Sequence, residues 1–98
     1  MKRMWTTDLN PDEHIVINTG KQEYFLTPTG GPDFLYEHSQ GANVLTLSSE
    51  ETTNLPGDVE IGLSRRRARF ANQVRIFIKA PKSVTFTKRP CPGTNQEQ

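Results

Sequence analysis

The sequence has one cysteine, two histidines and no apolar run long enough to cross a membrane. The single cysteine, Cys91, cannot form a disulfide within the chain and offers no spacing typical of a metal site. A membrane-spanning helix needs about 20 mostly apolar residues, so we expect no membrane partner. No apolar segment follows Lys2 and Arg3, so the sequence predicts no signal peptide and a cytoplasmic location.

Residue groupings typical of catalysis or metal binding are also missing. His14 and His38 stand far apart in the sequence without an obvious third ligand. No glycine-rich phosphate loop leads into a helix, and no nucleophile stands beside a base in a recognisable motif. We therefore expect no metal, no cofactor and no enzymatic activity.

Apolar residues are few and occur in short runs. They make up 33% of the 98 residues, and the mean hydropathy is −0.67, which suits one small domain with a modest core. Either some residues are tails, or a partner chain completes the core. No window shows the 3.6-residue apolar period of a helix, whereas turn signals separate short runs about every 8–12 residues. The sequence thus predicts an all-β fold, a small barrel or sandwich of short antiparallel strands.

The same runs give the expected strands and domain limits. Strands are expected at Glu13–Asn18, Lys21–Thr27, Phe34–His38, Asn43–Ser48, over VEIGL at 59–63 before the chain turns strongly basic, and twice within Ala71–Lys88. Residues 1–12 are polar and predict a flexible N-terminal arm, with Trp5 as a candidate anchor. Residues 13–89 would form a single β domain, and residues 90–98 a disordered tail.

The segment Ala71–Lys88 contains two alternating runs around a proline. Every second residue from Val74 to Ile78 is apolar and falls on one side of a strand, with basic residues on the other. Pro81 interrupts the run, and the alternation restarts at Val84. The pattern predicts a β-hairpin or a tight β-arch with a basic face; an ordinary core hairpin with a solvated polar face is the alternative.

Charge is divided unevenly along the chain. Residues 1–60 carry three Lys/Arg and ten Asp/Glu, a net charge of −7, whereas residues 61–98 carry nine and one, a net charge of +8. The densest cluster is SRRRAR at residues 64–69. Arginines in such a cluster neutralise phosphates, release counterions and can stack on bases. The alternative is that the basic part folds against carboxylates of its own chain.

Two motifs near the C-terminus, NQVRI at 72–76 and APKSV at 80–84, follow GDVEI at 57–61. In this order and spacing they resemble the carbon storage regulator family of small bacterial RNA-binding proteins, over residues 44–88. The resemblance implies a homodimer with interleaved strands, which would also complete a small core. It further implies binding to GGA-containing loops in messenger RNA leaders, with effects on translation and message stability.

The resemblance also implies a binding surface, in which the first strand of one chain lies beside the last strand of the other. It places Leu47 at an apolar contact of the first strand, Lys88 at a basic position of the last strand, and Lys82 after the Ala-Pro pair. The chain departs from the family at Glu50, because a carboxylate there repels phosphate where the family has arginine. Residues 1–42 have no counterpart in the family.

The charge cluster and the resemblance together define the predicted RNA-binding residues. These are Leu47, Arg65, Arg66, Arg67, Arg69, Arg75, Phe77, Lys82 and Lys88. Phe77 is a stacking candidate because it shares the basic side of its strand, whereas Phe70 and Phe86 are expected in the core. The predicted function is a homodimeric RNA-binding regulator; the alternative is a non-catalytic structural or interaction subunit of a phage or larger assembly.

Overall fold

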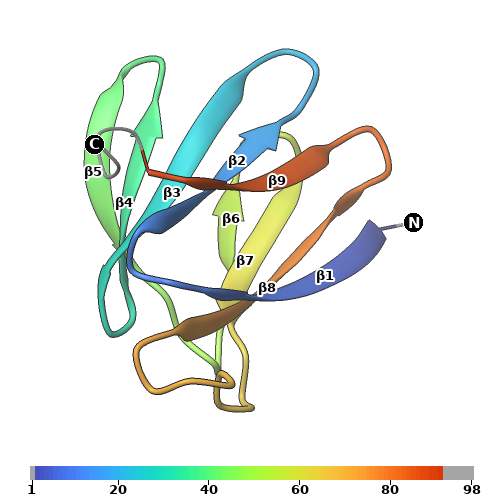
Figure 1. Cartoon of the computed structure of the whole chain (residues 1–98). Coiled ribbons are helices and arrows are strands. Elements are labelled where there is room, and N and C mark those ends of the chain that lie inside the picture. The colour runs from blue at the N-terminus through green and yellow to red at the C-terminus, as the bar shows by residue number, and fades with distance from the viewer. Residues whose placement is uncertain (1, 92–98) are drawn as a thin grey trace.

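The computed structural model describes residues 2–91 of the chain. This part forms nine strands joined by turns and loops, without a helix (Figure 1). The strands are β1 (Lys2–Leu9), β2 (Glu13–Asn18), β3 (Glu23–Gly30), β4 (Asp33–His38), β5 (Gly41–Thr46), β6 (Thr53–Leu55), β7 (Val59–Leu63), β8 (Val74–Pro81) and β9 (Thr85–Pro90). The predicted all-β class is confirmed. Across residues 2–91, no helix has the length and apolar character needed to cross a membrane.

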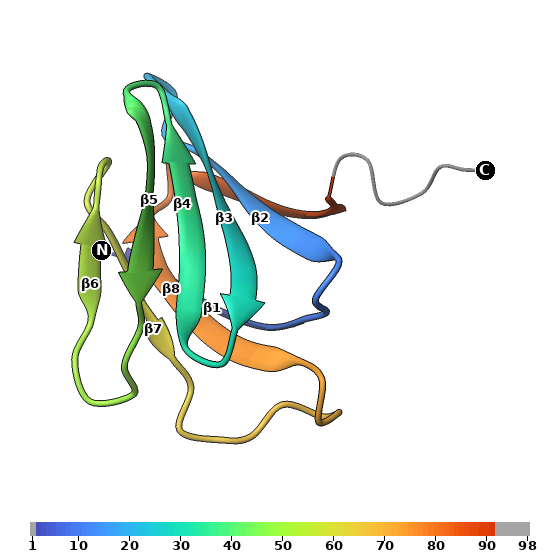
Figure 2. The same cartoon turned by 90° about the vertical axis from the view of Figure 1, so that its left-hand side faces the viewer.

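The strands pair antiparallel in two sheets. The strand order is β1-β8-β7-β6 in the four-stranded sheet and β5-β4-β3-β2-β9 in the five-stranded sheet. The two sheets face each other as layers with a shared apolar core between them (Figure 2). The architecture is therefore a sandwich with open sheet edges, one of the two predicted forms.

Alternating side chains build the core from both sheets. Ile76, Ile78 and Ala80 of β8 are fully buried, and so is Tyr24 on the opposing sheet. The Tyr24 hydroxyl donates a hydrogen bond to the Pro56 carbonyl at 2.7 Å, so burial leaves its polar atom satisfied. The same burial raises the pKa of Tyr24. One chain thus buries a continuous core.

Residues 2–9 do not form the flexible arm that their polarity predicts. β1 pairs with β8 along its whole length, from Lys2 opposite Pro81 to Leu9 opposite Val74. Leu9 is fully buried, and Trp5 packs against the core. Sequence reasoning missed the strand because its two core-facing apolar residues are too far apart to give an alternating pattern.

The C-terminal third forms a β-arch, the second of the two structures predicted for it. β8 belongs to the four-stranded sheet and β9 to the five-stranded sheet, so they do not pair with each other. The Val84 amide donates to the Pro81 carbonyl at 3.0 Å in the turn that carries the chain between the layers. The predicted disordered tail starts at Pro90, which ends β9; residues 92–98 lie outside the described residues.

Candidate nucleic-acid interface

The predicted arginines lie in a long loop between β7 and β8. β7 ends at Leu63, and we call residues 64–73 the arginine loop. The strand expected over residues 59–63 coincides with β7, and the basic run after it forms a loop as expected, because its charged side chains have no apolar alternation with which to face the core. The Ser64 amide makes a last bond to the Arg75 carbonyl at 2.9 Å, and the Ser64 hydroxyl then accepts from the Arg66 amide at 3.2 Å.

The charge of the arginine loop is largely unneutralised by carboxylates of the described residues. Arg65 Nη2 lies 3.9 Å from Glu50 Oε1, and both side chains are more than 70% exposed. No ion pair joins Arg66, Arg67 or Arg69 to a carboxylate within residues 2–91. These three guanidinium groups are therefore available to an external anion.

Phe70 and Phe86 differ in their surroundings. Phe70, at the end of the charge cluster, is 57% exposed, so its expected burial is wrong. The Arg69 guanidinium lies 5.6 Å from the centre of the Phe70 ring. Phe86 is half-buried and packs against the core, as expected. An exposed ring beside arginines is the kind of surface on which a nucleic-acid base stacks.

Arg75 is bound to Asp8 and positions the loop. Its Nε donates to Asp8 Oδ1 at 2.6 Å and its Nη2 to Oδ2 at 3.0 Å, which links β8 to β1 through two parallel hydrogen bonds. These bonds hold the pKa of Asp8 below its usual value and raise the pKa of Arg75. The Arg69 amide also donates to Asp8 Oδ2, at 3.3 Å. Arg75 is therefore engaged within the fold, unlike its neighbours in the loop.

Leu47 and Phe77 were both predicted to contact RNA, but only Phe77 lies on the side of its strand that the prediction requires. Leu47 is only 3% exposed, so the apolar contact that the resemblance assigns to it is not accessible. Phe77 does lie on the same side of β8 as Lys79, whose ammonium is 5.9 Å from the ring centre. Its half-buried ring covers Gly62, where an added Cβ would approach it to 2.8 Å.

β1 and β9 lie side by side without pairing, each at an edge of its own sheet (Figure 1). Three contacts join them: Arg3 Nη2 donates to the Val84 carbonyl at 3.2 Å, the Trp5 and Phe86 rings stack with centroids 5.3 Å apart, and Lys88 Nζ donates to the Asp8 carbonyl at 3.1 Å. The contacts advance in the same direction along both segments. We call this boundary, residues 3–8 against 84–89, the β1–β9 seam.

A groove of about 410 Å³ follows the seam. It is lined by Arg3, Met4, Trp5, Thr85 and Phe86. Met4 is 64% exposed. Arg3 lines this groove, Lys88 and Arg89 are exposed residues of the seam, and Lys82 is exposed in the β8–β9 turn. The predicted residues Lys82 and Lys88 thus belong to a surface whose β1 side was not predicted at all.

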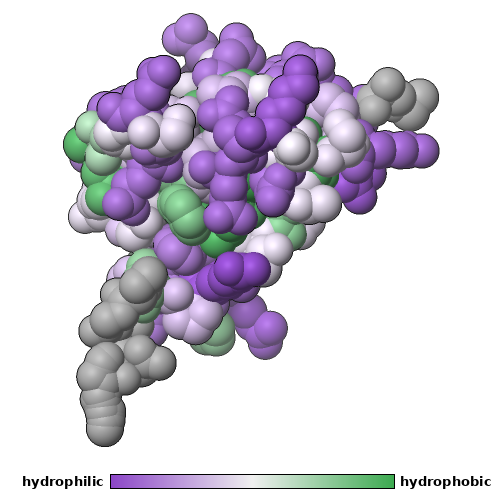
Figure 3. Space-filling model, turned by 90° about the horizontal axis from the view of Figure 1, so that it is seen from above, coloured by the Kyte–Doolittle hydropathy of each residue, from purple (hydrophilic) through white to green (hydrophobic). Residues whose placement is uncertain are grey.

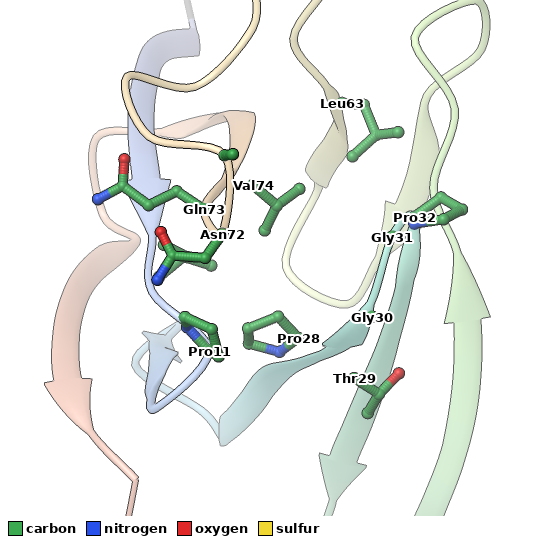
Figure 4. Close-up of a pocket in the computed structure, with 12 residues that line it drawn as sticks. Pro11, Pro28, Thr29, Gly30, Gly31, Pro32, Leu63, Asn72, Gln73 and Val74 are labelled. Carbon is green, nitrogen blue, oxygen red and sulfur yellow. The ribbon is translucent and has the colours of Figure 1, made fainter.

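A larger cavity, of about 710 Å³, opens between the arginine loop and the β3–β4 turn (Figure 4). Proline, glycine and aliphatic residues make up most of its lining, and none of the described lining residues is charged. Gln73, on its loop side, donates from Nε2 to Asn10 Oδ1 at 3.0 Å. This cavity does not suit a phosphate group.

The upper end of the sandwich, which carries the β8–β9 turn, is mostly hydrophilic (Figure 3). Hydrophobic residues interrupt that surface only in places. Contacts made there would depend on charged and polar groups more than on a broad apolar patch.

His14 and His38 do not come together in a metal site. No group of three or more His, Cys, Asp or Glu side chains suited to a metal occurs in residues 2–91. His14 is 6% exposed and stacks on Phe25, with ring centroids 5.4 Å apart.

No family model, curated protein or solved structure matches the chain.

Proposed function

We propose that the protein is a non-catalytic RNA-binding regulator that acts after transcription in the bacterial cytoplasm. The main support is the arginine loop, where Arg66, Arg67 and Arg69 form no ion pair with any carboxylate of the described residues. Unpaired surface arginines bind phosphates with release of counterions. The ligand that the resemblance implies is single-stranded or stem-loop RNA from message leaders, and the consequence is altered translation and message stability.

The proposed binding surface has two adjoining parts. The arginine loop would contact phosphates, while the exposed Met4 and the Trp5–Phe86 stack of the seam would face bases. Asp8 lies where the two parts meet, because it accepts a bond from the Arg69 amide and its carbonyl accepts one from Lys88. A single RNA strand could therefore follow the seam and continue onto the loop.

Fluorescence anisotropy with a labelled GGA stem-loop RNA tests this proposal at several salt concentrations. The variant R65E/R66E/R67E should bind at least about ten-fold more weakly. Its slope of log affinity against log salt should be smaller by about 2, since each single-strand phosphate contact contributes roughly 0.7. No salt-dependent binding by the unmodified protein, or equal binding by the variant, would contradict the proposal.

Two control variants define what the loop contributes. R65K/R66K/R67K keeps the charge and loses the planar fork of arginine, so it should retain most of the salt dependence. Lys21→Glu changes the charge of an exposed residue in the β2–β3 turn and should leave the affinity within about two-fold. Equal losses in the Lys21→Glu and triple glutamate variants would point to a net-charge effect with no role for the loop.

A structural or interaction subunit of a larger assembly is the second candidate. Within residues 2–91, no strand pairs with the outer edge of β5, and Val44 on that strand is 63% exposed. An unpaired edge strand can accept a strand from another molecule. Size-exclusion chromatography with light scattering separates the candidates, because a ring or filament supports assembly and a small discrete particle supports the regulator.

A further inference from the structure

The two sheets repeat one pattern of connections. In the five-stranded sheet, β2, β3 and β4 are neighbours in chain order, and β5 pairs with β4. In the four-stranded sheet, β6, β7 and β8 are neighbours in chain order, and β1 pairs with β8. If each strand of the first half is matched with the strand four places later, β1 with β5 through β4 with β8, the order β1-β8-β7-β6 becomes β5-β4-β3-β2. Each half of the chain thus adds its first strand to the sheet of the other half.

The registers agree with this correspondence. Across β1 and β8, Trp5 lies opposite Ile78 and Thr7 opposite Ile76; across β5 and β4, Asn43 lies opposite Tyr36 and Leu45 opposite Phe34. The corresponding core positions are buried in both halves: Leu9 and Leu47, Ile17 and Leu55, Tyr24 and Val59, Leu26 and Ile61, Phe34 and Ile76, Tyr36 and Ile78. The repeat therefore extends from the topology to individual side chains.

One side-chain contact is also repeated in altered form. Asp8 on β1 binds Arg75 on β8, and at the corresponding place Thr46 of β5 donates to Asp33 Oδ1 of β4 at 2.7 Å. The main difference lies in one connection, because the arginine loop replaces the short turn between β3 and β4. The two halves thus share one arrangement of strands and differ mainly in this basic loop.

We propose that the chain is an internal duplication, a single-chain form of a strand-exchanged dimer, that keeps only one ligand seam. β9 follows β8 and fills the edge beside β2, but no strand of the described residues fills the corresponding edge beside β6. Gly41, Ala42 and Asn43 stand where the seam has Arg3, Met4 and Trp5. The second position thus lacks the strand, the cation and the aromatic ring of the first. The ligand, single-stranded RNA, rests on the proposed function; the duplication does not.

Cysteine cross-linking of the full chain tests whether the exchange occurs within one molecule. In a Cys91→Ser background, M4C/K79C and A42C/E37C join corresponding pairs that lie directly opposite across β1–β8 and β5–β4. Opposite residues in antiparallel strands have Cα atoms about 4.5–5.5 Å apart, within the range for a disulfide. Both variants should oxidise to a band of monomer mass on a non-reducing gel. Covalent dimers, or no disulfide in either variant, would overturn the internal exchange.

RNA stoichiometry tests the single seam. Native mass spectrometry with the GGA stem-loop should show one RNA bound per chain, and two per chain would overturn the single seam. Met4→Glu should weaken binding at least about ten-fold, whereas Ala42→Glu, the same charge change at the corresponding position, should leave it within about two-fold. Equal effects of the two substitutions would also overturn it. Absence of any RNA binding would count against the proposed function and would leave the cross-linking result standing.

Discussion

Leu47 follows β5 and points into the core, with 3% of its surface exposed. Truncating a buried leucine removes apolar contacts and leaves a cavity, so Leu47→Ala should lower the free energy of unfolding by about 2–5 kcal/mol. Val44, within β5, is 63% exposed, and Val44→Ala should change the free energy of unfolding by less than about 0.5 kcal/mol. Urea unfolding measures both. Equal costs would contradict the burial of Leu47 and the exposure of Val44.

The Asp8–Arg75 pair should make the free energy of unfolding depend on pH in the acidic range. Hydrogen bonds from Arg75 hold the pKa of Asp8 below the ordinary value of 3.8. A carboxyl with a lowered folded-state pKa contributes stability that is complete above its unfolded pKa and is lost as the pH falls through the folded one. The stability deficit of Asp8→Asn should therefore be largest near neutral pH and shrink steadily below about pH 4.

Unfolding curves of the unmodified protein and Asp8→Asn at pH 7, 5, 3 and 2 measure that deficit. Glu50→Gln is the matched control, because the exposed Arg65–Glu50 contact at 3.9 Å should contribute nothing measurable. A deficit for Asp8→Asn that stays constant from pH 7 to pH 2 would show that the pair is not held in the folded state.

At the scale of elements, the turn between β6 and β7 contains Gly57, which lies against Thr19 of the β2–β3 turn. Gly57 has φ +88°, and a Cβ there would lie 2.4 Å from Thr19 Cγ2. Gly20 has φ +90° with open space around it. Gly20→Ala should cost about 1–2 kcal/mol from backbone strain alone, and Gly57→Ala should cost more because it also displaces Thr19. Thermal or urea unfolding compares them, and equal costs would mean that the two turns do not touch.

Strand positions could be read from the sequence where alternation is dense. The expected strand at Glu13–Asn18 coincides with β2, and the break after β8 follows from proline geometry, although the sequence did not decide between a hairpin and an arch there. β1 could not be found in this way, since Trp5 and Leu9 are separated by polar residues. Alternation shows which side chains share a face, but it does not show which strand lies alongside.

The same limit explains what was and was not predicted of the candidate site. The arginine loop is visible as a run of like charge, and its placement on the surface needs no tertiary information. The seam is different, because Arg3, Met4 and Trp5 acquire a common surface with Phe86 only when the first and last strands are brought together. Leu47 was assigned a contact by resemblance alone, and its burial could only be seen in the fold.

For the molecule as a whole, the uneven charge of the sequence is only partly compensated inside the fold. Asp8–Arg75 and Lys2–Glu60 each join residues distant in the sequence and link β1 to β8 and β7. The bond to Glu60 raises the pKa of Lys2 and lowers that of Glu60. Among residues 2–91, the arginines of the loop take almost no part in this compensation, which leaves positive charge concentrated beside one end of the seam.

The exchange of first strands has a consequence for unfolding. Each sheet contains strands from both halves of the chain, so neither half can unfold without exposing the core of the other. Trp5, the only tryptophan, lies on β1 and stacks on Phe86 of β9, so its fluorescence reports the seam between the sheets. We expect urea transitions followed by Trp5 fluorescence and by far-ultraviolet circular dichroism to coincide, as a two-state domain requires.

Substitutions in the two halves sharpen this expectation. Leu26→Ala in β3 and Ile61→Ala in β7 remove corresponding core side chains from opposite sheets. Each substitution should lower the urea midpoint reported by both probes by the same amount, because the destabilisation affects the whole molecule. A fluorescence transition that precedes the loss of β-structure would mean that β1 leaves the four-stranded sheet independently. β1 would then be an appended strand, and the two halves would fold without needing each other.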